Sequence, residues 1–206
     1  MSPTRPVLHV RRALLAVAAL CAFPGAASAQ VDGAPIPANR SPHLAFVIAT
    51  RLEAGGDRVA TVQFEDGSEQ HVVSGQGATL AVGGALRPHR GSPFAVRATA
   101  GLKFMTTKAT NADIYLLRVP LELVGTYDFA GDFHVGGGYV RHTALRFHGG
   151  GIADDVRFED ANGGTVELGW RWAALAYTKI DYTDEFGNTY DASNVGLVLT
   201  LTLGGR

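Results

Sequence analysis

Charged side chains recur at alternate positions within otherwise apolar segments, and these residues are the best placed in the sequence to do chemistry. Between Phe94 and Phe104 every second residue is apolar, and small or polar residues lie between them. This period of two predicts a β-strand with one apolar face and one polar face. Six charged residues lie on the polar faces of this and later segments: Arg97, Lys103, Arg118, Glu122, Glu167 and Arg171. Gathered on one side of a sheet, they would form a structural ion-pair network or line a narrow passage for ions.

Other titratable residues fit no catalytic or metal-binding pattern. Eight acidic residues lie in two segments expected to be loops or strand ends: Asp154, Asp155, Glu159, Asp160, Asp181, Asp184, Glu185 and Asp191. Their spacing matches no EF-hand loop, so we interpret them as solvated. The run Gly136-Gly137-Gly138 precedes no helical pattern and is no phosphate loop. It would instead leave room for the interior Arg and Glu side chains. We therefore predict no catalytic site, no cofactor and no metal.

Eight segments have the alternation needed to position these charges. They are Leu44 to Glu53, Ala78 to Leu86, Phe94 to Phe104, Ile114 to Phe129, Phe133 to Phe147, Thr165 to Trp172, Leu175 to Thr183, and Asn194 to Leu203. The excursion from Asp57 to Gly77 contains Asp66-Gly67 between two alternating runs, which predicts a hairpin. Connections after the first, third, fifth and seventh strands are expected to be long, with KATNAD after the third. The others are expected to be short.

The N-terminus has the pattern of an export signal. Arg5, Arg11 and Arg12 precede an apolar stretch too short to span a membrane, and Ala27-Ser28-Ala29 is a cleavage pattern. We predict a signal peptide at 1–29, an extended leader at 30–43 and one barrel domain at 44–206. Cleavage would remove Cys21, the only cysteine, which excludes disulfides and thiolate chemistry in the remaining chain.

The composition of the remaining chain limits the kinds of partner it could bind and how it could cross a membrane. The signal segment has three arginines and no acid, so fifteen basic and nineteen acidic residues remain, a net charge of −4. A mildly acidic chain without a basic block argues against nucleic acid. No later stretch reaches the roughly 18 apolar residues of a transmembrane helix, so any membrane crossing would be made by a closed β-barrel.

Alternation alone does not say which face points inward. A lipocalin-like soluble barrel also alternates, with its apolar face inside. Here the polar faces are mostly Gly, Ala and Thr with a few charges of both signs, unlike a solvated surface. Aromatic residues lie near strand ends, as interfacial girdles do: Phe94, Phe104, Tyr127, Phe129, Phe133, Trp170, Trp172 and Tyr182. We predict apolar side chains outside and charges inside.

With its signal segment, eight strands and charged interior, the chain resembles the small eight-stranded outer-membrane barrels of the OmpA/OmpX-like group. Fragments such as FEDGS, PLEL and AYTKIDY are similar to uncharacterised proteobacterial outer-membrane barrel proteins. The resemblance implies an up-and-down transmembrane barrel in the bacterial outer membrane, assembled by the barrel-assembly machinery and surrounded by lipid and lipopolysaccharide. Such proteins usually end in an aromatic residue, whereas this chain ends LTLGGR. Barrel hydrolases of that membrane carry a His-x-Ser pattern, which Arg141-His142-Thr143 lacks.

These observations predict a monomeric barrel without enzymatic activity. Its leading role would be structural, in envelope integrity or in surface interaction through the outer loops. Two alternatives stay open. One is a narrow channel for ions or small solutes, and the other is a soluble periplasmic ligand-binding barrel.

Overall fold

Antiparallel β-strands make up most of the chain that the structure describes. The computed structural model describes residues 41–63, 69–109, 112–150 and 155–204, all within one compact unit, Ala38–Arg206. The expected signal peptide at 1–29 and the leader up to residue 40 lie outside the described residues. The leader was expected to extend to residue 43, but the first strand already begins at His43.

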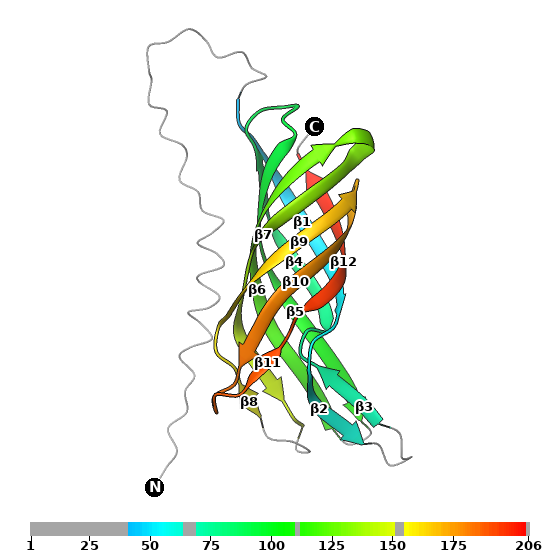
Figure 1. The fold of residues 1–206 in the computed structure, drawn as a ribbon, viewed down its shortest axis with the longest axis vertical. Coiled ribbons are helices and arrows are strands. Elements are labelled where there is room, and N and C mark those ends of the chain that lie inside the picture. The colour runs from blue at the N-terminus through cyan, green and yellow to red at the C-terminus, as the bar shows by residue number, and fades with distance from the viewer. Residues whose placement is uncertain (1–40, 64–68, 110–111, 151–154, 205–206) are drawn as a thin grey trace. The chain divides into compact units, whose positions relative to one another are not determined.

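Eight of the strands pair into a closed ring, which confirms the predicted all-β fold (Figure 1). In ring order they are β1 (His43–Ala54), β4 (Gly77–Arg87), β5 (Phe94–Ala109), β6 (Ala112–Phe129), β7 (Phe133–His148), β9 (Ala161–Trp170), β10 (Ala173–Thr183) and β12 (Asn194–Leu203). Pairing of β12 with β1 closes the sheet, so none of the eight presents a free edge along its paired length.

Following register partners once around the ring leads back to the starting strand at a position ten residues further along. Starting at Phe94 of β5 and following register partners through β6, the path returns to β5 at Phe104. The eight partners on this path are Tyr127, Val135, Leu168, Leu175, Leu197, Leu52, Ala78 and Phe104. Such a stagger in an eight-stranded barrel corresponds to strands tilted by about 40°. All of these side chains lie on the outer face, so the register alone sets a continuous apolar belt.

The two ends of the barrel differ. One, here called the short-turn end, carries residues 88–93, the 3-10 turn η2 (Ala130–Asp132) and residues 171–172. The other, the long-loop end, carries the hairpin of β2 (Arg58–Gln63) and β3 (Glu69–Val73), together with β8 (Val156–Arg157) and β11 (Thr189–Asp191). The last strand, β12, ends at the short-turn end (Figure 1).

One connection expected to be long is short. Residues 110–111 alone join β5 to β6, because both strands continue through most of the expected KATNAD loop and pair up to Ala109 and Ala112. Pro120 occupies the polar side of β6, as expected. It lies where the β5 ladder is interrupted between Ala100 and Lys103 and beside a bulge between β6 and β7, so its missing N–H costs little.

The outer wall is apolar and the lumen is polar at mid-height. Outward side chains such as Leu175, 61% exposed, alternate with inward ones such as Ala174, 7% exposed. Fully buried side chains include Arg118 and Lys103, residue types that are seldom fully buried unless they are paired. Within the described residues, no helix is long and apolar enough to cross a membrane.

Candidate functional site

Three ion pairs fill the middle of the lumen. The pairs are Arg51 Nη2 with Glu122 Oε2 at 2.5 Å, Arg97 Nη2 with Glu167 Oε2 at 2.7 Å, and Lys103 Nζ with Glu53 Oε2 at 2.9 Å. Each side chain is at most 10% exposed, so the charges lie away from bulk water. Buried ions cost several kcal/mol each in desolvation unless they are paired, so this pairing is a condition of the fold.

Glycines make the space that these side chains occupy. A Cβ at Gly136 would lie 2.7 Å from Cγ of Glu167, and one at Gly196 would lie 2.7 Å from Cγ of Glu53. Both glycines face inward, Gly136 on β7 and Gly196 on β12, where an eight-stranded lumen is only just wide enough for side chains. The expectation that Gly136 makes room for an interior carboxylate is therefore confirmed.

Arg118 is the one lumen cation without a carboxylate partner among the described residues. Its Nη1 donates to the carbonyl oxygen of Ser74 and, at 3.1 Å, to the hydroxyl of Tyr182. Its Nη2 donates to the carbonyl oxygen of Gln76, and Lys103 Nζ donates to that of Gly75 at 2.8 Å. Two cations thus hold three successive carbonyls of the segment 74–76, which follows β3 and enters β4.

That segment closes the lumen toward the long-loop end. Ser74 is fully buried, and its Oγ donates to the Asp191 carbonyl at 2.6 Å. The Gly75 amide donates to the Gly55 carbonyl at 3.1 Å, joining the segment to the turn after β1. Beyond it, buried apolar side chains form two clusters inside the barrel, around Leu116 and around Ile180. The long-loop end is therefore packed rather than open.

His142 belongs to the same closed region. Its Nδ1 lies 2.5 Å from the Tyr182 hydroxyl, and both side chains are buried. The sequence assigned Tyr182 to the outer aromatic girdle, and that assignment was wrong because its side chain faces the lumen. Thr143, next to His142, hydrogen-bonds to the Val119 carbonyl at 3.4 Å. Among the described residues, the hydrogen-bond partner of the His142 ring is the Tyr182 hydroxyl.

A cavity of about 130 Å³ opens at the short-turn end. Its mouth carries the pair Arg87 and Asp128, whose Nη2 and Oδ2 atoms are 2.7 Å apart, and its lining includes Arg97 and His134. His134 Nε2 lies 3.9 Å from Oε1 of Glu167. The lumen thus has a polar vestibule at one end, a paired network in the middle and an apolar plug at the other.

Five of the six expected interior charges lie in the lumen: Arg97, Lys103, Arg118, Glu122 and Glu167. The prediction was wrong for Arg171. Its strand ends at Trp170, and Arg171 adopts φ 55° in the turn to β10, so the alternation no longer applies. The side chain is 57% exposed, lies over the Trp170 ring and donates from Nε to Asp132 at 3.1 Å.

Two lumen charges were missed by sequence reasoning. Arg51 and Glu53 lie on β1, whose inward face also carries Val47. Because Val47 is an apolar residue on the inward face, the alternation of apolar and polar residues along β1 was harder to recognise. Counting every second residue back from Glu53 would have placed both charges on the inner face. With them, four cations face three carboxylates in the described lumen, an excess of one positive charge.

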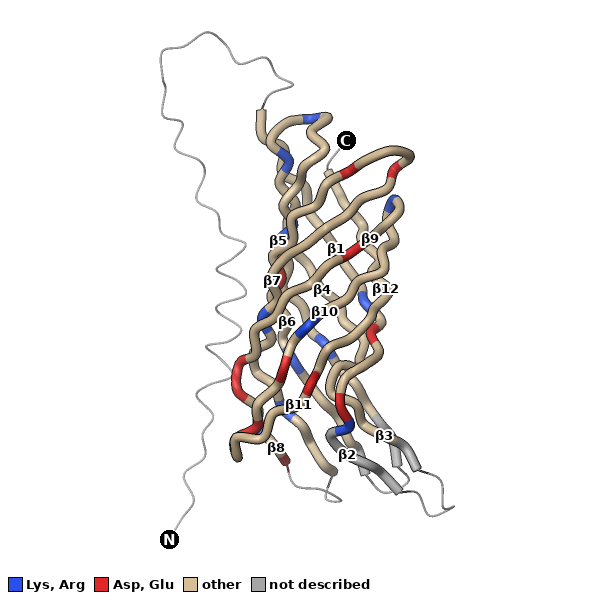
Figure 2. Tube along the Cα trace, viewed as in Figure 1, with Lys and Arg blue, Asp and Glu red and all other residues tan. Residues whose placement is uncertain are grey.

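The acidic residues of the long-loop end make local contacts. Asp160 pairs with Arg141 at 2.8 Å, and Lys179 lies between Asp181 and Asp191 at 3.1 and 3.2 Å. Asp154 lies outside the described residues. Figure 2 shows acidic positions gathered at this end of the barrel. No group of three or more possible ligand side chains is placed to hold a metal ion in the described parts of the chain.

Asp184 organises the turn before β11. Its carboxylate accepts hydrogen bonds from the amides of Phe186 and Asn188, from Asn188 Nδ2 and from the Tyr190 hydroxyl, at 2.8–3.2 Å. Burial alone would raise the pKa of this carboxyl, but these donors hold the pKa below its ordinary value of 3.8. The turn presents Phe186, which is 76% exposed.

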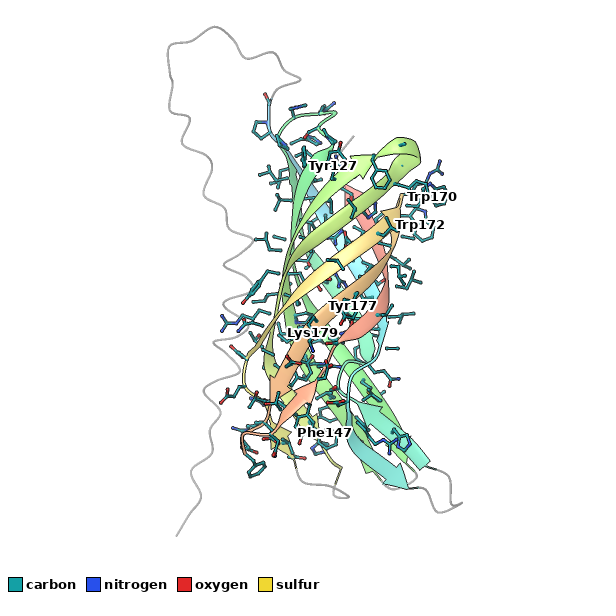
Figure 3. All side chains as sticks on the ribbon, viewed as in Figure 1. Tyr127, Phe147, Trp170, Trp172, Tyr177 and Lys179 are labelled. Carbon is teal, nitrogen blue, oxygen red and sulfur yellow. The ribbon has the colours of Figure 1, made fainter. Side chains whose placement is uncertain are left out.

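The outer wall has aromatic residues at both limits of its apolar belt. Figure 3 shows Tyr127, Trp170 and Trp172 toward the short-turn end, with Tyr177 farther along the barrel, followed by Lys179. On β7, Tyr139 is likewise followed by the outward Arg141. On β5 the outward apolar side chains extend from Phe94 to Phe104. Ten residues at about 3.3 Å each, tilted by about 40°, span about 25 Å.

Searches found no family model, no curated protein and no solved structure that matches this chain.

Proposed function

We propose that this chain is a bacterial outer-membrane β-barrel that contributes to envelope structure or surface interaction through its long-loop end. The observation that carries the proposal is the distribution of side chains: apolar side chains lie outside and charged side chains lie inside, the reverse of the distribution in a soluble protein. Seven of the eight register partners on the belt are large apolar residues, 41–63% exposed. In water such a belt would be a large aggregation-prone surface, whereas lipid tails cover it without cost.

The dimensions of the apolar belt also support a lipid environment around it. Its height of about 25 Å equals the apolar band of outer-membrane barrels, and tyrosine and tryptophan lie at its limits, where headgroups begin. We infer that the short-turn end faces the periplasm and the long-loop end faces outward. The N-terminal segment 1–29 would direct export and be removed, and the barrel-assembly machinery would insert a monomer among lipid and lipopolysaccharide.

The closed lumen favours a scaffold over a pore. The three ion pairs, the segment 74–76 and the apolar clusters follow one another along the axis, and their buried side chains occupy the lumen from its middle to the long-loop end. The vestibule at the short-turn end is the observation that favours the second candidate, a narrow channel for ions or small solutes. We assign no catalytic activity to either.

Membrane fractionation with gel mobility before and after boiling tests the proposal. We expect recovery in the outer membrane and a band that shifts on boiling, because a closed barrel resists detergent until heated. Recovery in the soluble periplasmic fraction without a shift would replace the proposal with a soluble ligand-binding barrel. Planar-bilayer recordings on the same sample separate the two membrane functions. A scaffold gives no resolved current, and discrete current steps would favour the channel.

A further inference from the structure

Arg146 and Arg157 face each other on the outer wall, near the long-loop end. They are register partners in the ladder between β7 and β8, and both are exposed. The next pair along this ladder, Phe147 with Val156, takes the opposite face, where Phe147 is buried. Both guanidinium groups therefore belong to the outer surface. Like charges directly opposite each other destabilise a sheet, so this placement costs energy unless an anion lies between them.

Neither guanidinium has a hydrogen bond or ion pair within the described part of the chain. By contrast, Arg141 on the same outer face of β7 is held by Asp160 at 2.8 Å. Asp155, two residues before Arg157, is engaged elsewhere: its Oδ1 lies 2.9 Å from His148 Nδ1 and accepts the Gly149 amide at 3.0 Å. The two arginines thus form a site with two free positive charges.

The position of this pair indicates what surrounds it. On β7 the apolar outward residues end at Tyr139, and Arg141 and then Arg146 follow toward the long-loop end. Beside the pair, the Tyr115 ring packs against the His148 ring with centroids 4.9 Å apart, which adds an aromatic wall. If the belt lies in lipid, as proposed above, the pair lies beside the outer headgroup layer.

We propose that Arg146 and Arg157 bind the phosphate group of a lipid headgroup in the outer leaflet. A planar guanidinium donates two parallel hydrogen bonds to phosphate, and two guanidiniums facing each other can hold one phosphate between them. The phosphate would also remove the repulsion between the arginines. Inorganic phosphate offers the same chemistry, and the experiment separates these two sources.

The test uses the full chain refolded in a neutral detergent, with binding measured by calorimetry. The probes are purified lipopolysaccharide, the same lipopolysaccharide after removal of its phosphates, and sodium phosphate. The variants are Arg146→Gln and Arg157→Gln, and Arg141→Gln is the matched control because it removes an arginine from the same outer face. Gel mobility before and after boiling reports separately whether each sample is a closed barrel.

We expect each site variant to weaken binding of intact lipopolysaccharide by about tenfold, the scale of one lost charge-assisted contact. Arg141→Gln should change the affinity for intact lipopolysaccharide by less than about twofold. Once the phosphates are removed, the parent chain and the three variants should bind lipopolysaccharide with the same affinity. Equal affinity of the parent chain and the site variants for intact lipopolysaccharide overturns the inference. If no sample changes its gel mobility on boiling, the membrane proposal fails, and binding of sodium phosphate then tests the arginine site by itself. Binding that depends on Arg146 supports the site, and its absence overturns it.

Discussion

The side chain of Glu167 passes over Gly136 so closely that a Cβ on that glycine would lie 2.7 Å from Glu167 Cγ. Glu167 in turn holds Arg97 at 2.7 Å, so the glycine leaves room for one of the ion pairs in the middle of the lumen. The neighbouring Gly137 faces outward, and a Cβ there would approach nothing closer than 3.9 Å.

Gly136→Ala should therefore destabilise the barrel and Gly137→Ala should not. Overpacking of a filled interior costs about 1–3 kcal/mol, whereas an added methyl on the outer wall removes a flexible glycine from a strand. The measurement is urea unfolding of the refolded barrel followed by gel mobility. Equal unfolding midpoints for the two variants would show that Gly136 does not set the position of Glu167.

Leu168→Arg should distinguish lipid from water around the belt. Leu168 is 57% exposed and lies midway along the apolar run of its wall. An arginine near the bilayer midplane costs about 2–4 kcal/mol, and much less near the interface. Leu44→Arg, at the short-turn limit of β1, is the control and should cost less. Unfolding of both variants in lipid vesicles measures the difference. A soluble barrel would tolerate both changes equally, and that result would contradict the membrane proposal.

The pair Arg51 and Glu122 should show strong coupling in a double-mutant cycle. Both side chains are at most 10% exposed, so removing one partner leaves a buried charge, at a cost of about 3–5 kcal/mol. We expect Arg51→Met or Glu122→Met alone to shift the unfolding midpoint strongly, and the double variant to recover much of the loss. The exposed pair Arg141 and Asp160, mutated in the same way, should show little coupling. Additive losses at Arg51 and Glu122 would mean that the lumen admits water.

The turn around Asp184 should lose its order as the pH falls below 4. The folded pKa of this carboxyl is lowered below its ordinary value of 3.8 by its hydrogen-bond donors. Its stabilising contribution is therefore complete above the unfolded pKa and disappears as the pH falls through the folded pKa. Amide exchange at Phe186 and Asn188, measured against pH, should accelerate in this window. Asp184→Asn should remove the pH dependence, and an unchanged profile in that variant would assign the effect to another group.

Much of the strand pattern could be read from the sequence because alternation is local. A strand exposes successive side chains to opposite faces, so Arg97, Lys103, Arg118, Glu122 and Glu167 could be assigned to one side before any pairing was known. The same rule fails where a strand ends. Arg171 was misplaced because a two-residue turn with positive φ begins there, which the continuing apolar spacing of Trp170 and Trp172 concealed.

By itself, the sequence determined the eight ring strands and their two faces, since both follow from a period of two and from turn residues. Only the tertiary structure decided which charges meet. Arg51 and Glu122 are 71 residues apart, and the ten-residue rise of the closed ring brings them within 2.5 Å. The same is true of Arg118, whose partners on the segment 74–76 come from a loop returning into the lumen. Register and loop paths depend on the whole closed sheet, and no local pattern contains them.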